Sequence, residues 1–413
     1  MPLKRPTIEN VANIKVVGIG GGGNAALNRM IQANIKGVEF IAVNTDAQAL
    51  HYSGAPTKLH IGQTVTRGLG AGMNPALGQQ AAEESREEIY ELLKGSDMVF
   101  TAGGFGGGTA TGALPVVSEI AREVGALTVA IVTKPFSFEG QQRMTLAEEA
   151  LVELQSRADA SVVIPNDRLL QIIDKKTSLI DAFRVVDDVL RQGVQGISDL
   201  ITHHGMVNVD FADIKAIMQN AGSALMGIGR ASGENRAVEA ARAAIDSPML
   251  DITIDGAKGI VFNITAGPDL RMYEVEAVAR TITEHADPHA KVIFGAVMDS
   301  DQVEEGEMKI TVVATGFDKP QNMIRPSQNA AYMPMQHMPP RGVVMQEPMQ
   351  PQEQPRQSQP LRSPYGQSMS PMNRQNTIPQ KFGNVEEEDL EVPTFIRRKM
   401  RERRQNQTEE PLE

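Results

Sequence analysis

The order of apolar and polar positions divides the first part of the chain into alternating strands and helices. Mostly apolar runs occur at residues 14–19, 38–44, 97–102, 127–133 and 160–165. Between them, apolar positions recur at helical spacing, at residues 24–33, at 75–94 and after the second of two glycine-rich turns. Apolar strands separated by helices are typical of a parallel sheet that is covered on both faces. We therefore predict a doubly wound α/β domain over residues 1–177, with a flexible start.

A long helix and a smaller domain are predicted next. Between residues 178 and 203, apolar residues recur at helical spacing, which predicts one central helix. Gly193 and Gly196 each weaken this helix by about 1 kcal/mol relative to alanine, so we expect close packing at both positions. Residues 204–317 predict an α+β domain with a mixed sheet. Its strands are expected at 222–229, 259–265, 291–299 and 308–316, and its helices from 210, at 235–245 and at 272–286.

The composition changes near residue 316. Of the 37 glycines, 34 precede this point, whereas residues 318–388 contain 12 Pro, 12 Gln and 8 Met. This stretch lacks the apolar surface that would offset its chain entropy, so we predict a disordered linker. Residues 389–413 regain some apolar pattern, including Leu390, Phe395 and Ile396, and a basic run that ends at Arg404. This segment is either a peptide that orders on a partner or a chance fluctuation in a disordered tail.

Composition and charge exclude several classes of function. The chain has no cysteine, which rules out disulfides and Cys-ligated zinc, and its seven histidines form no HExxH motif. Aromatic residues make up only 4% of the chain, and residues 1–317 hold 27 basic against 39 acidic side chains. Both features disfavour nucleic-acid binding. Because the sequence shows neither an apolar run of membrane-spanning length nor a secretory signal, we expect a soluble cytoplasmic protein.

The first glycine-rich turn, Gly-Ile-Gly-Gly-Gly-Gly-Asn-Ala at residues 18–25, joins the first predicted strand to the first helix. Glycines let a ligand approach the backbone, and the free N–H groups at a helix start favour an anion. The turn contains G-x-G-x-x-G, and Asp46 follows at the distance of a ribose-binding acid. A dinucleotide-dependent oxidoreductase is therefore one interpretation, and tight packing of strand against helix is another.

A second glycine-rich turn, at residues 103–112, favours a different ligand. It also joins a strand to a helix, and the oxidoreductase interpretation leaves it unexplained. Two such turns on parallel strands of one sheet can hold one polyphosphate from two sides, with Thr109 and Thr111 as hydroxyl donors. No GxxxxGK[ST] motif supplies a phosphate-binding lysine. Backbone amides, and a metal ion carried on the phosphates, would then have to neutralise the charge.

Residues 208–213, Asn-Val-Asp-Phe-Ala-Asp, directly follow the predicted central helix. If Asp210 begins the next helix, Asp210 and Asp213 are three residues apart and face the same side. One interpretation is ordinary capping, with Asp210 as N-cap and Asp213 in the first helical turn. The other is a pair of carboxylates that polarises and orients a water molecule.

Together these features resemble the FtsZ family, the tubulin-like GTPases that polymerise into the bacterial division ring. Residues 106–112, GGGTATG, resemble the highly specific signature GGGTGTG of tubulin and FtsZ. The similarity runs from about residue 10 to residue 316 and returns at residues 389–398. It includes residues 44–46 (NTD), 67–72 (RGLGAG), 134–143 and 164–167 (IPND). The resemblance implies the tubulin/FtsZ fold and hydrolysis of GTP to GDP and phosphate, with Mg²⁺ bound through the phosphates.

The resemblance also implies roles for individual residues. Glu139 and Arg143 would contact the ribose and phosphates, whereas Asn166, Phe183 and Asp187 would hold the guanine. The other residues expected against the nucleotide are Gly20, Gly21, Gly22, Gly23, Asn24, Ala25, Asn44, Ala71, Gly106, Gly107, Gly108, Thr109, Ala110 and Thr111. The residues Asn208, Asp210 and Asp213 would complete the GTP site of the neighbouring subunit and position the attacking water. Hydrolysis would then require polymerisation.

The cellular role that the resemblance implies is that of a head-to-tail filament in the cytoplasm, at the mid-cell division ring. Leu390, Pro393, Phe395, Ile396 and Arg397 belong to a segment that resembles the family's docking peptide for membrane tethers and division regulators. Neither a nucleic-acid partner nor a transmembrane segment is expected. Three alternatives stay open: another tubulin-like filament, for plasmid segregation or cell shape; a non-hydrolysing scaffold; and the dinucleotide-dependent oxidoreductase.

One position departs from the family signature. Ala110 stands where the signature has its fifth residue, a glycine, and Phe105 fills the place before the triple glycine. A methyl group at position 110 costs little if the backbone φ angle is negative, and it is harmful if φ is positive or if the methyl points at phosphate. We expect nucleotide binding to be retained and turnover to be the property that changes.

Overall fold

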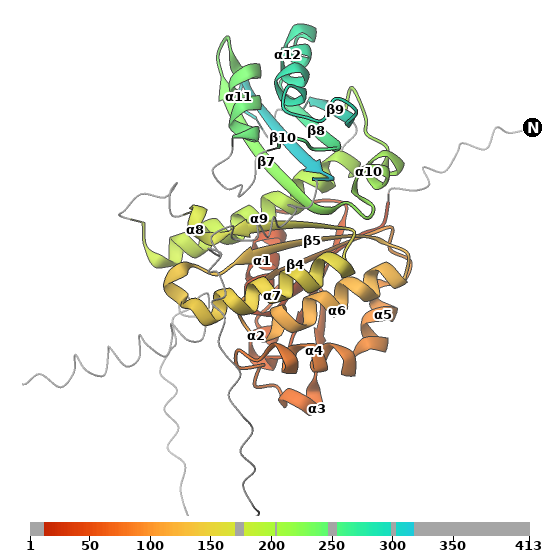
Figure 1. The fold of residues 1–413 in the computed structure, drawn as a ribbon, viewed down its shortest axis with the longest axis vertical. Helices are drawn as coiled ribbons and strands as arrows, with labels where there is room; N and C mark the ends of the chain where they lie inside the picture. The colour runs from red at the N-terminus through yellow and green to blue at the C-terminus, as the bar shows by residue number, and fades with distance from the viewer. Residues whose placement is uncertain (1–11, 170–176, 203–204, 247–253, 299–302, 318–413) are drawn as a thin grey trace, which may run out of the picture. The chain divides into compact units, whose positions relative to one another are not determined.

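The computed structural model describes residues 12–169, 177–202, 205–246, 254–298 and 303–317 (Figure 1). In these residues one ten-stranded sheet carries helices on both faces, with the strand order β3-β2-β1-β4-β5-β6-β7-β10-β8-β9. The expected linker at 318–388 and the expected docking peptide at 389–413 lie outside the described residues. Among the described helices, none has the length and apolar content that crossing a membrane requires.

Six parallel strands form the first part of the sheet. They are β1 (Ile14–Ile19), β2 (Val38–Asn44), β3 (Thr57–His60), β4 (Met98–Gly104), β5 (Leu127–Lys134) and β6 (Ala160–Pro165). The register pairs Gly18 with Ala42 on one side and with Ala102 on the other. Because all neighbours in this part are parallel, the carboxyl ends of the strands meet at one edge. The doubly wound arrangement is confirmed.

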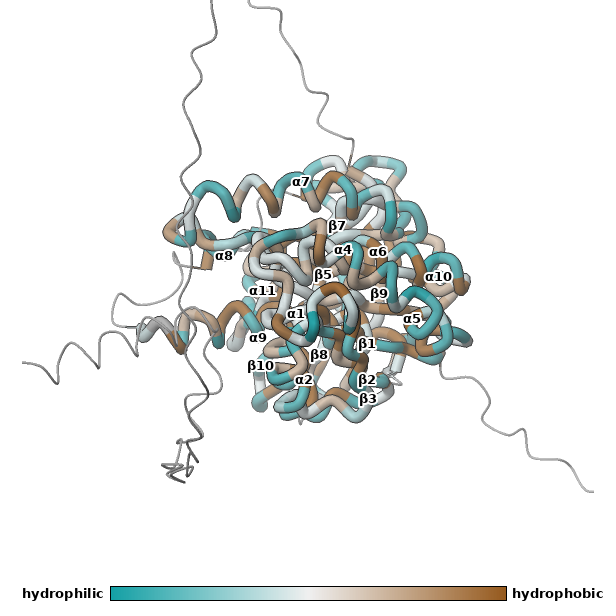
Figure 2. Tube along the Cα trace, turned by 90° about the horizontal axis from the view of Figure 1, so that it is seen from below, coloured by the Kyte–Doolittle hydropathy of each residue, from teal (hydrophilic) through white to brown (hydrophobic). Residues whose placement is uncertain are grey.

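Helices cover both faces of these strands. On one face, α1 (Gly20–Gln32) and the central α9 (Leu179–Thr202) pack on side chains such as Val16. On the other face, packed on side chains such as Val17, lie α4 (Pro75–Glu84), α5 (Arg86–Leu93), α6 (Thr109–Glu123) and α7 (Gln141–Arg157). The outer helix α7 alternates between hydrophilic and hydrophobic segments along its length (Figure 2). Shorter elements are α2 (Ala47–His51), α3 (Gln63–Thr66), η1 (Ser137–Glu139) and α8 (Asn166–Leu169).

The remaining strands make the sheet mixed. β7 (Gly222–Ser232) pairs in parallel with β6 at three positions only. β10 (Glu307–Thr315) runs antiparallel to both β7 and β8 (Gly259–Ala266), and the edge strand β9 (Lys291–Met298) runs parallel to β8. α11 (Arg236–Ile245) and α12 (Met272–Thr283) cover one face, and α10 (Phe211–Met218) packs with α9 on the other. The predicted α+β part with a mixed sheet is confirmed.

The two glycines of α9 lie at close contacts. A Cβ atom on Gly193 would lie 3.1 Å from Ile131 Cδ1, and one on Gly196 would lie 2.8 Å from Thr311 Cγ2. The helix therefore approaches β5 and β10 more closely than a larger residue would permit. This contact confirms the close packing that the sequence predicts, and it explains glycine in a helix interior.

Two predicted helices have different bounds in the structure. The helix expected at 24–33 starts at Gly20, because the glycines of the first turn already belong to the first helical turn. Gly20 itself lies in the left-handed region, at φ 71°. The helix expected at 75–94 is wrong as a single element. It consists of α4 and α5, which are separated at the buried Ser85, whose φ of −103° and ψ of 19° interrupt the helical hydrogen bonds. Neither α7 nor β3 had been predicted.

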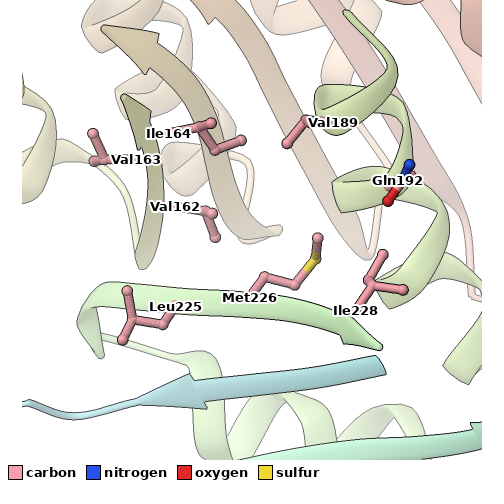
Figure 3. A pocket seen from close by; sticks show the side chains of 8 residues that line it. All are labelled: Val162, Val163, Ile164, Val189, Gln192, Leu225, Met226 and Ile228. Atoms are coloured by element: carbon pink, nitrogen blue, oxygen red, sulfur yellow. The ribbon is translucent and has the colours of Figure 1, made fainter. Parts of the chain in front are cut away.

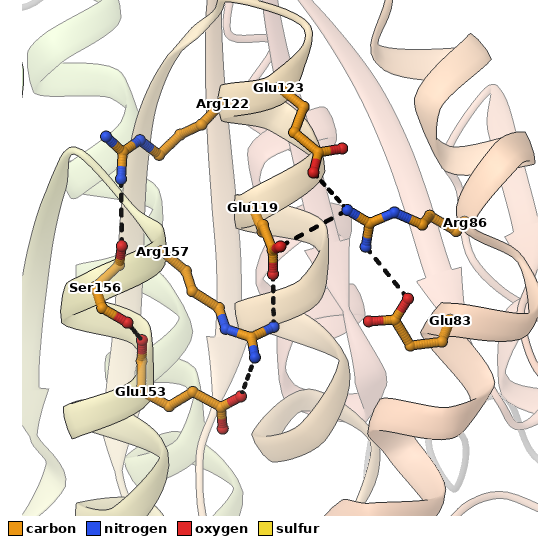
Figure 4. A network of polar contacts seen from close by, with 8 residues as sticks. All are labelled: Glu83, Arg86, Glu119, Arg122, Glu123, Glu153, Ser156 and Arg157. Atoms are coloured by element: carbon orange, nitrogen blue, oxygen red, sulfur yellow. Dashed lines mark hydrogen bonds and ion pairs between the residues drawn. The ribbon is translucent and has the colours of Figure 1, made fainter.

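Ion pairs connect the outer helices α5, α6 and α7 (Figure 4). Arg86 Nη2 lies 2.6 Å from Glu123 Oε1 and 3.7 Å from Glu119 Oε1. On the other side, Arg157 Nη1 lies 2.8 Å from Glu119 Oε2. Such partly exposed pairs contribute about 0–1 kcal/mol each. The apolar core beneath these helices, rather than the ion pairs, therefore holds them on the sheet.

Candidate functional site

The two glycine-rich turns meet at the carboxyl edge of the sheet. Because β1 and β4 are neighbouring parallel strands, the turns that follow them lie side by side. A Cβ atom on Gly20 would lie 3.2 Å from the Ala110 nitrogen, and one on Gly22 would lie 3.5 Å from the Gly104 nitrogen. The helices α1 and α6 therefore begin next to each other at this edge.

Neither of these helix starts is capped by a side chain. The N-cap residues are Ile19 for α1 and Gly108 for α6, and neither first turn contains an acidic residue. The first N–H groups of a helix have no partner within the helix and carry partial positive charge, so uncapped starts bind anions. Two such starts side by side fit a polyphosphate.

The glycines of these turns fall into two groups. A Cβ atom on Gly23 would lie 2.4 Å from a carbonyl oxygen of β4, and one on Gly112 would lie 1.9 Å from the Pro75 oxygen, so these two permit close backbone packing. Around Gly21 and Gly107, by contrast, no atom of the described residues lies within 4 Å of the Cβ position, apart from the adjoining backbone. That open space is where a ligand can approach the backbone.

Three buried asparagines at this edge have polar atoms without partners. Asn24 lies on α1, Asn44 ends β2 and Asn166 begins α8, and each is at most 5% exposed. Within the described residues, both polar atoms of the Asn24 side chain, Nδ2 of Asn44 and Oδ1 of Asn166 lack a hydrogen-bond partner. An unsatisfied buried amide costs about 1–3 kcal/mol, so such groups normally bind a water molecule or a ligand. A ligand with both donors and acceptors, such as a nucleotide, fits these residues.

The central helix α9 contributes a carboxylate and an aromatic ring. Asp187 Oδ2 accepts a hydrogen bond from Arg29 Nε of α1 at 3.0 Å, and the Asp187 side chain is 13% exposed. The half-buried Phe183 meets Phe136 edge to face, with ring centroids 5.6 Å apart. A carboxylate accepts from the N–H groups of a base, and an aromatic ring stacks on its face. The sequence missed Arg29, since nothing in its local pattern distinguishes it on α1.

Three other predicted residues contact the turns or lie beside them. Thr111 is buried, and its hydroxyl accepts a hydrogen bond from the Gly106 N–H at 3.0 Å. Ala71 is buried too, and a Cβ atom on Gly108 would lie 2.8 Å from the Ala71 Cβ. Ala25 is half-buried in the first half of α1. In the structure Thr111 and Ala71 therefore shape the second turn.

Several charged side chains at this edge already have partners. Arg143 Nη1 donates to Glu139 Oε2 at 2.8 Å, and Glu139 Oε1 accepts from the Phe136 N–H at 3.0 Å. Asp46 accepts from the Ala49 N–H at 2.9 Å and caps α2. Asp46 is the acid that the oxidoreductase interpretation assigned to a ribose, and its capping of α2 gives a structural reason for an acid at this position.

Ala110, the departure from the family signature, is buried between the two turns. It lies in the first turn of α6 with a negative φ angle and is 5% exposed. Cβ atoms on Gly20 and Gly103 would lie 3.3 Å and 3.2 Å from the Ala110 Cβ. The methyl group therefore fills space between backbone segments, and the negative φ angle is the condition under which alanine costs little at this position.

The expected catalytic residues lie at the opposite edge of the sheet. A Cβ atom on Gly37, which precedes β2, would lie 2.6 Å from Thr202 Cγ2, so α9 ends at the amino edge of the parallel strands. From Asp187 to Thr202, α9 covers about 22 Å at 1.5 Å per residue. Residues 208–213 follow beyond this end. They are therefore separated by the length of the helix from the glycine turns of the same chain.

The segment with the expected catalytic residues is anchored on the edge strand β9. Val207 exchanges two backbone hydrogen bonds with this strand, of 3.2 and 3.0 Å. Asn208 Oδ1 accepts a backbone N–H three residues earlier in the chain, at 2.6 Å. Asp210 caps α10 by accepting the N–H of the second helical residue at 3.4 Å, and Asp213 lies in the first turn. Capping by Asp210 is thus confirmed, while both aspartates remain exposed.

An apolar pocket elsewhere in the protein contains none of the predicted site residues (Figure 3). It opens where β6 and β7 diverge beyond their three paired positions, beside α9. Its lining residues are Val162, Val163, Ile164, Val189, Gln192, Leu225, Met226 and Ile228. Since Gln192 alone among these is polar, the pocket does not fit a polyphosphate.

Paired glycine turns at one sheet edge, and a central helix that leads to a second, mixed part of the sheet, define a tubulin-like nucleotide-binding protein. Residues 13–174 match the GTPase domain of the Tubulin/FtsZ family, and residues 222–318 match the C-terminal domain of the FtsZ family. The chain belongs to the FtsZ family of GTPases.

Solved structures agree with this assignment. A structure of an empty FtsZ dimer from M. jannaschii is 46% identical to this chain, with a TM-score of 0.70, and the match covers 74% of this chain and 88% of that one. A mutant of FtsZ from M. jannaschii matches at the same identity and TM-score over 91% of its length. CetZ2 from Haloferax volcanii, solved as a GTPγS-bound protofilament, is 20% identical with a TM-score of 0.65, covers 74% of this chain and 94% of its own, and shares the fold.

Proposed function

We propose that this chain assembles head to tail into filaments and hydrolyses GTP at the contact between subunits. The main support is the separation of two half-sites by α9. The uncapped helix starts and unsatisfied asparagines suit GTP or GDP at one edge, whereas the exposed Asp210 and Asp213 lie beyond the other. A complete hydrolytic site therefore needs the nucleotide of one subunit and the carboxylates of the next.

The proposed chemistry divides between the two half-sites. The starts of α1 and α6 would stabilise negative charge on the phosphates, while Asp210 and Asp213 would accept hydrogen bonds from the attacking water and orient it. Mg²⁺ on the phosphates would supply further charge neutralisation. Following the resemblance to the FtsZ family, we assign Mg²⁺ to the phosphates and not to protein side chains.

Both edges expose apolar side chains that such a contact would cover. Leu69 is 86% exposed and Met73 38% exposed, in the segment that packs on the second glycine turn. Near the catalytic segment, Met206 is 63% exposed and Phe294 39% exposed. Because the two surfaces differ, each subunit keeps one of them free after the first contact, and assembly continues into open filaments.

In the cell we propose a role in the division ring at mid-cell, in the cytoplasm. The support is membership of the FtsZ family together with the segment at 389–398 that resembles its docking peptide for membrane tethers and division regulators. Deletion of residues 389–413 is expected to leave assembly intact and to abolish binding to a tether. A filament protein that segregates plasmids or sets cell shape would instead localise away from the division site.

The decisive experiment mixes two inactive variants. Asp213→Ala keeps the nucleotide edge but loses a catalytic carboxylate, whereas Gly107→Leu keeps the carboxylates but fills the nucleotide space. Each variant alone should release little phosphate from GTP, and their mixture should recover part of the activity, because one contact then combines two intact half-sites. If the mixture stays inactive while the unsubstituted protein hydrolyses GTP, the proposal of a site shared between two subunits is wrong.

Nucleotide specificity separates the remaining alternatives. Light scattering with GTP, GDP and NAD, followed by phosphate release, should show assembly with GTP and no assembly with NAD. Assembly with GTP but without phosphate release would identify a non-hydrolysing scaffold. Tight binding of NAD instead of guanine nucleotides would favour the oxidoreductase.

A further inference from the structure

A buried hydroxyl group lies directly behind the second glycine turn. Thr45 follows β2, has no exposed surface, and its Oγ1 lies 2.6 Å from Oγ1 of Thr109, the first residue of α6. The two residues are 64 positions apart in the chain. Thr109 itself is half-buried at the uncapped helix start, where the fold and the proposed function bring the phosphates.

The backbone of Thr45 connects this hydroxyl pair to the neighbouring loop. Its carbonyl oxygen accepts from the Gly70 N–H, from the Thr66 hydroxyl and from His60 Nε2, each at 3.3 Å. That loop continues to Ala71, which packs on the second glycine turn. Thr45 therefore joins β2, the loop and the start of α6 at one point.

The chemistry of a phosphate fixes the direction of the hydrogen bond between the two threonines. Phosphate oxygens only accept hydrogen bonds, so Thr109 must donate its hydroxyl proton to bind one. The Thr109 oxygen can then serve only as acceptor toward Thr45, which must be the donor. A hydroxyl that accepts one hydrogen bond becomes a better donor for the next, so this order strengthens the contact with phosphate.

We propose that Thr45 is a positioning residue for nucleotide phosphates, acting through Thr109. The proposal rests on the proposed function, because it assumes that guanine nucleotides bind at this edge. The hydroxyl of Thr45 would orient the Thr109 hydroxyl toward the phosphate chain and keep its proton available. It would not contact the nucleotide, and it would not contribute to guanine recognition by Asp187, which lies on α9.

A second hydroxyl pair on the same helix supplies a matched control. Thr101 of β4 lies 2.9 Å from the Ser118 hydroxyl of α6, and both residues are fully buried. This pair also joins a buried threonine to α6, but it lies nine residues, or about 13 Å, further along the helix from its start. Removing the Thr101 hydroxyl tests the structural effect of one buried hydrogen bond without changing the nucleotide edge.

The test compares Thr45→Val, Thr45→Ser and Thr101→Val in the full chain. Affinities for GTP, GDP and guanosine are measured by competition with a fluorescent nucleotide, and stability by thermal unfolding. Valine keeps the shape of threonine, so Thr45→Val should bind GTP and GDP roughly five- to tenfold more weakly, with guanosine unchanged. Thr45→Ser should restore binding, and Thr101→Val should lower only the melting temperature.

Two results would overturn the role of Thr45. One is unchanged affinity of Thr45→Val for GTP and GDP, and the other is an equal loss for guanosine, which would indicate general damage to the site. Failure of the unsubstituted protein to release phosphate from GTP would overturn the proposed function instead. Because the role of Thr45 is read from binding and the proposed function from hydrolysis, the two failures are distinguishable.

Discussion

The two helices that follow the glycine turns begin differently from α10 and α12 in the second part of the sheet. At the carboxyl edge of the parallel strands, α1 and α6 start without a side-chain cap. In the second part, Asp210 caps α10, and Glu274 at the start of α12 accepts from the Arg271 N–H at 2.8 Å. A capped helix satisfies its own first N–H groups, whereas an uncapped one leaves them to a ligand. A missing cap alone does not mark the nucleotide side, because α5, α7 and α11 also lack a side-chain cap and Asp46 caps α2. Two uncapped starts side by side, each at a glycine turn, do mark it.

The largest expected effect comes from Asp213, a carboxylate in the first turn of the capped helix α10. Asp213→Asn removes a negative charge but leaves the cap from Asp210, so α10 should form normally. We expect GTP turnover to fall by about 10³-fold while GTP affinity and assembly stay unchanged, because the nucleotide lies at the other edge. Phosphate release and titration with a fluorescent nucleotide measure the two quantities. Asp246→Asn, at the exposed end of α11, is the control. Undiminished turnover of Asp213→Asn would contradict the catalytic role of Asp213.

The second effect is on stability and its dependence on pH. The buried Arg236 donates to Glu274 at 2.7 and 3.0 Å, and these hydrogen bonds, with that from the Arg271 N–H, hold the pKa of Glu274 below its ordinary value. Arg236 Nη1 also lies 2.6 Å from Asp269 Oδ2, so Glu274→Gln leaves Arg236 with one anionic partner. The loss of the charged hydrogen bonds to Glu274 should lower the free energy of unfolding by about 2 kcal/mol at pH 7. GTP affinity of the folded variant should not change.

The sign of the pH dependence follows from the lowered pKa of Glu274. Its stabilisation is complete above the unfolded pKa of about 4.5 and is lost as the pH falls through the lower folded pKa. Urea unfolding between pH 7 and pH 3 should therefore show a smaller loss of stability for Glu274→Gln than for the unsubstituted protein. Glu276→Gln, exposed on the same helix, is the control and should behave like the unsubstituted protein. If the stability of Glu274→Gln fell with pH in parallel with that of the unsubstituted protein, the pairing of Glu274 with Arg236 would be contradicted.

A smaller effect, on GTP affinity, is expected at the uncapped start of α6. Gly107→Ala adds a Cβ atom that meets nothing within 4 Å in the described residues, so stability should stay the same. The added methyl group would occupy the space next to the α6 start, and GTP should bind roughly tenfold more weakly if one hydrogen bond to phosphate is lost. Gly54→Ala is a control with similar freedom, its nearest atom at 3.6 Å. Unchanged affinity would show that this space is not used by the nucleotide.

The smallest effect concerns the departure from the family signature. Sequence alone led us to expect altered turnover, but the buried methyl group of Ala110 lies between Gly20 and Gly103. Ala110→Gly should therefore lower the free energy of unfolding by about 1 kcal/mol, because glycine is a poorer helix former. GTP turnover per subunit should be identical in the two proteins. A faster or slower variant would show that the methyl group acts on the nucleotide.

The sequence predicted the elements that depend on local pattern. The strands β1, β2 and β6 have the predicted bounds, and both glycine turns follow strands as expected. The break between α4 and α5 was missed, because Ser85 carries no proline or glycine signal and residues on both sides keep helical spacing. The short elements after β2 (α2, β3 and α3) were also missed, since four or five residues contain no period to detect.

By itself, the sequence determined the order of strands and helices, the two glycine turns and the aspartates after the central helix. Only the tertiary structure decided which distant side chains meet. Arg29 pairs with Asp187 across 158 residues, Thr45 with Thr109 across 64, and Asn24, Asn44 and Asn166 gather at one edge. Apolar periodicity and glycine content are properties of neighbouring residues. The contacts between distant residues arise because parallel strands bring all their carboxyl ends to the same edge, and because α1 and α9 pack on the same face of the sheet.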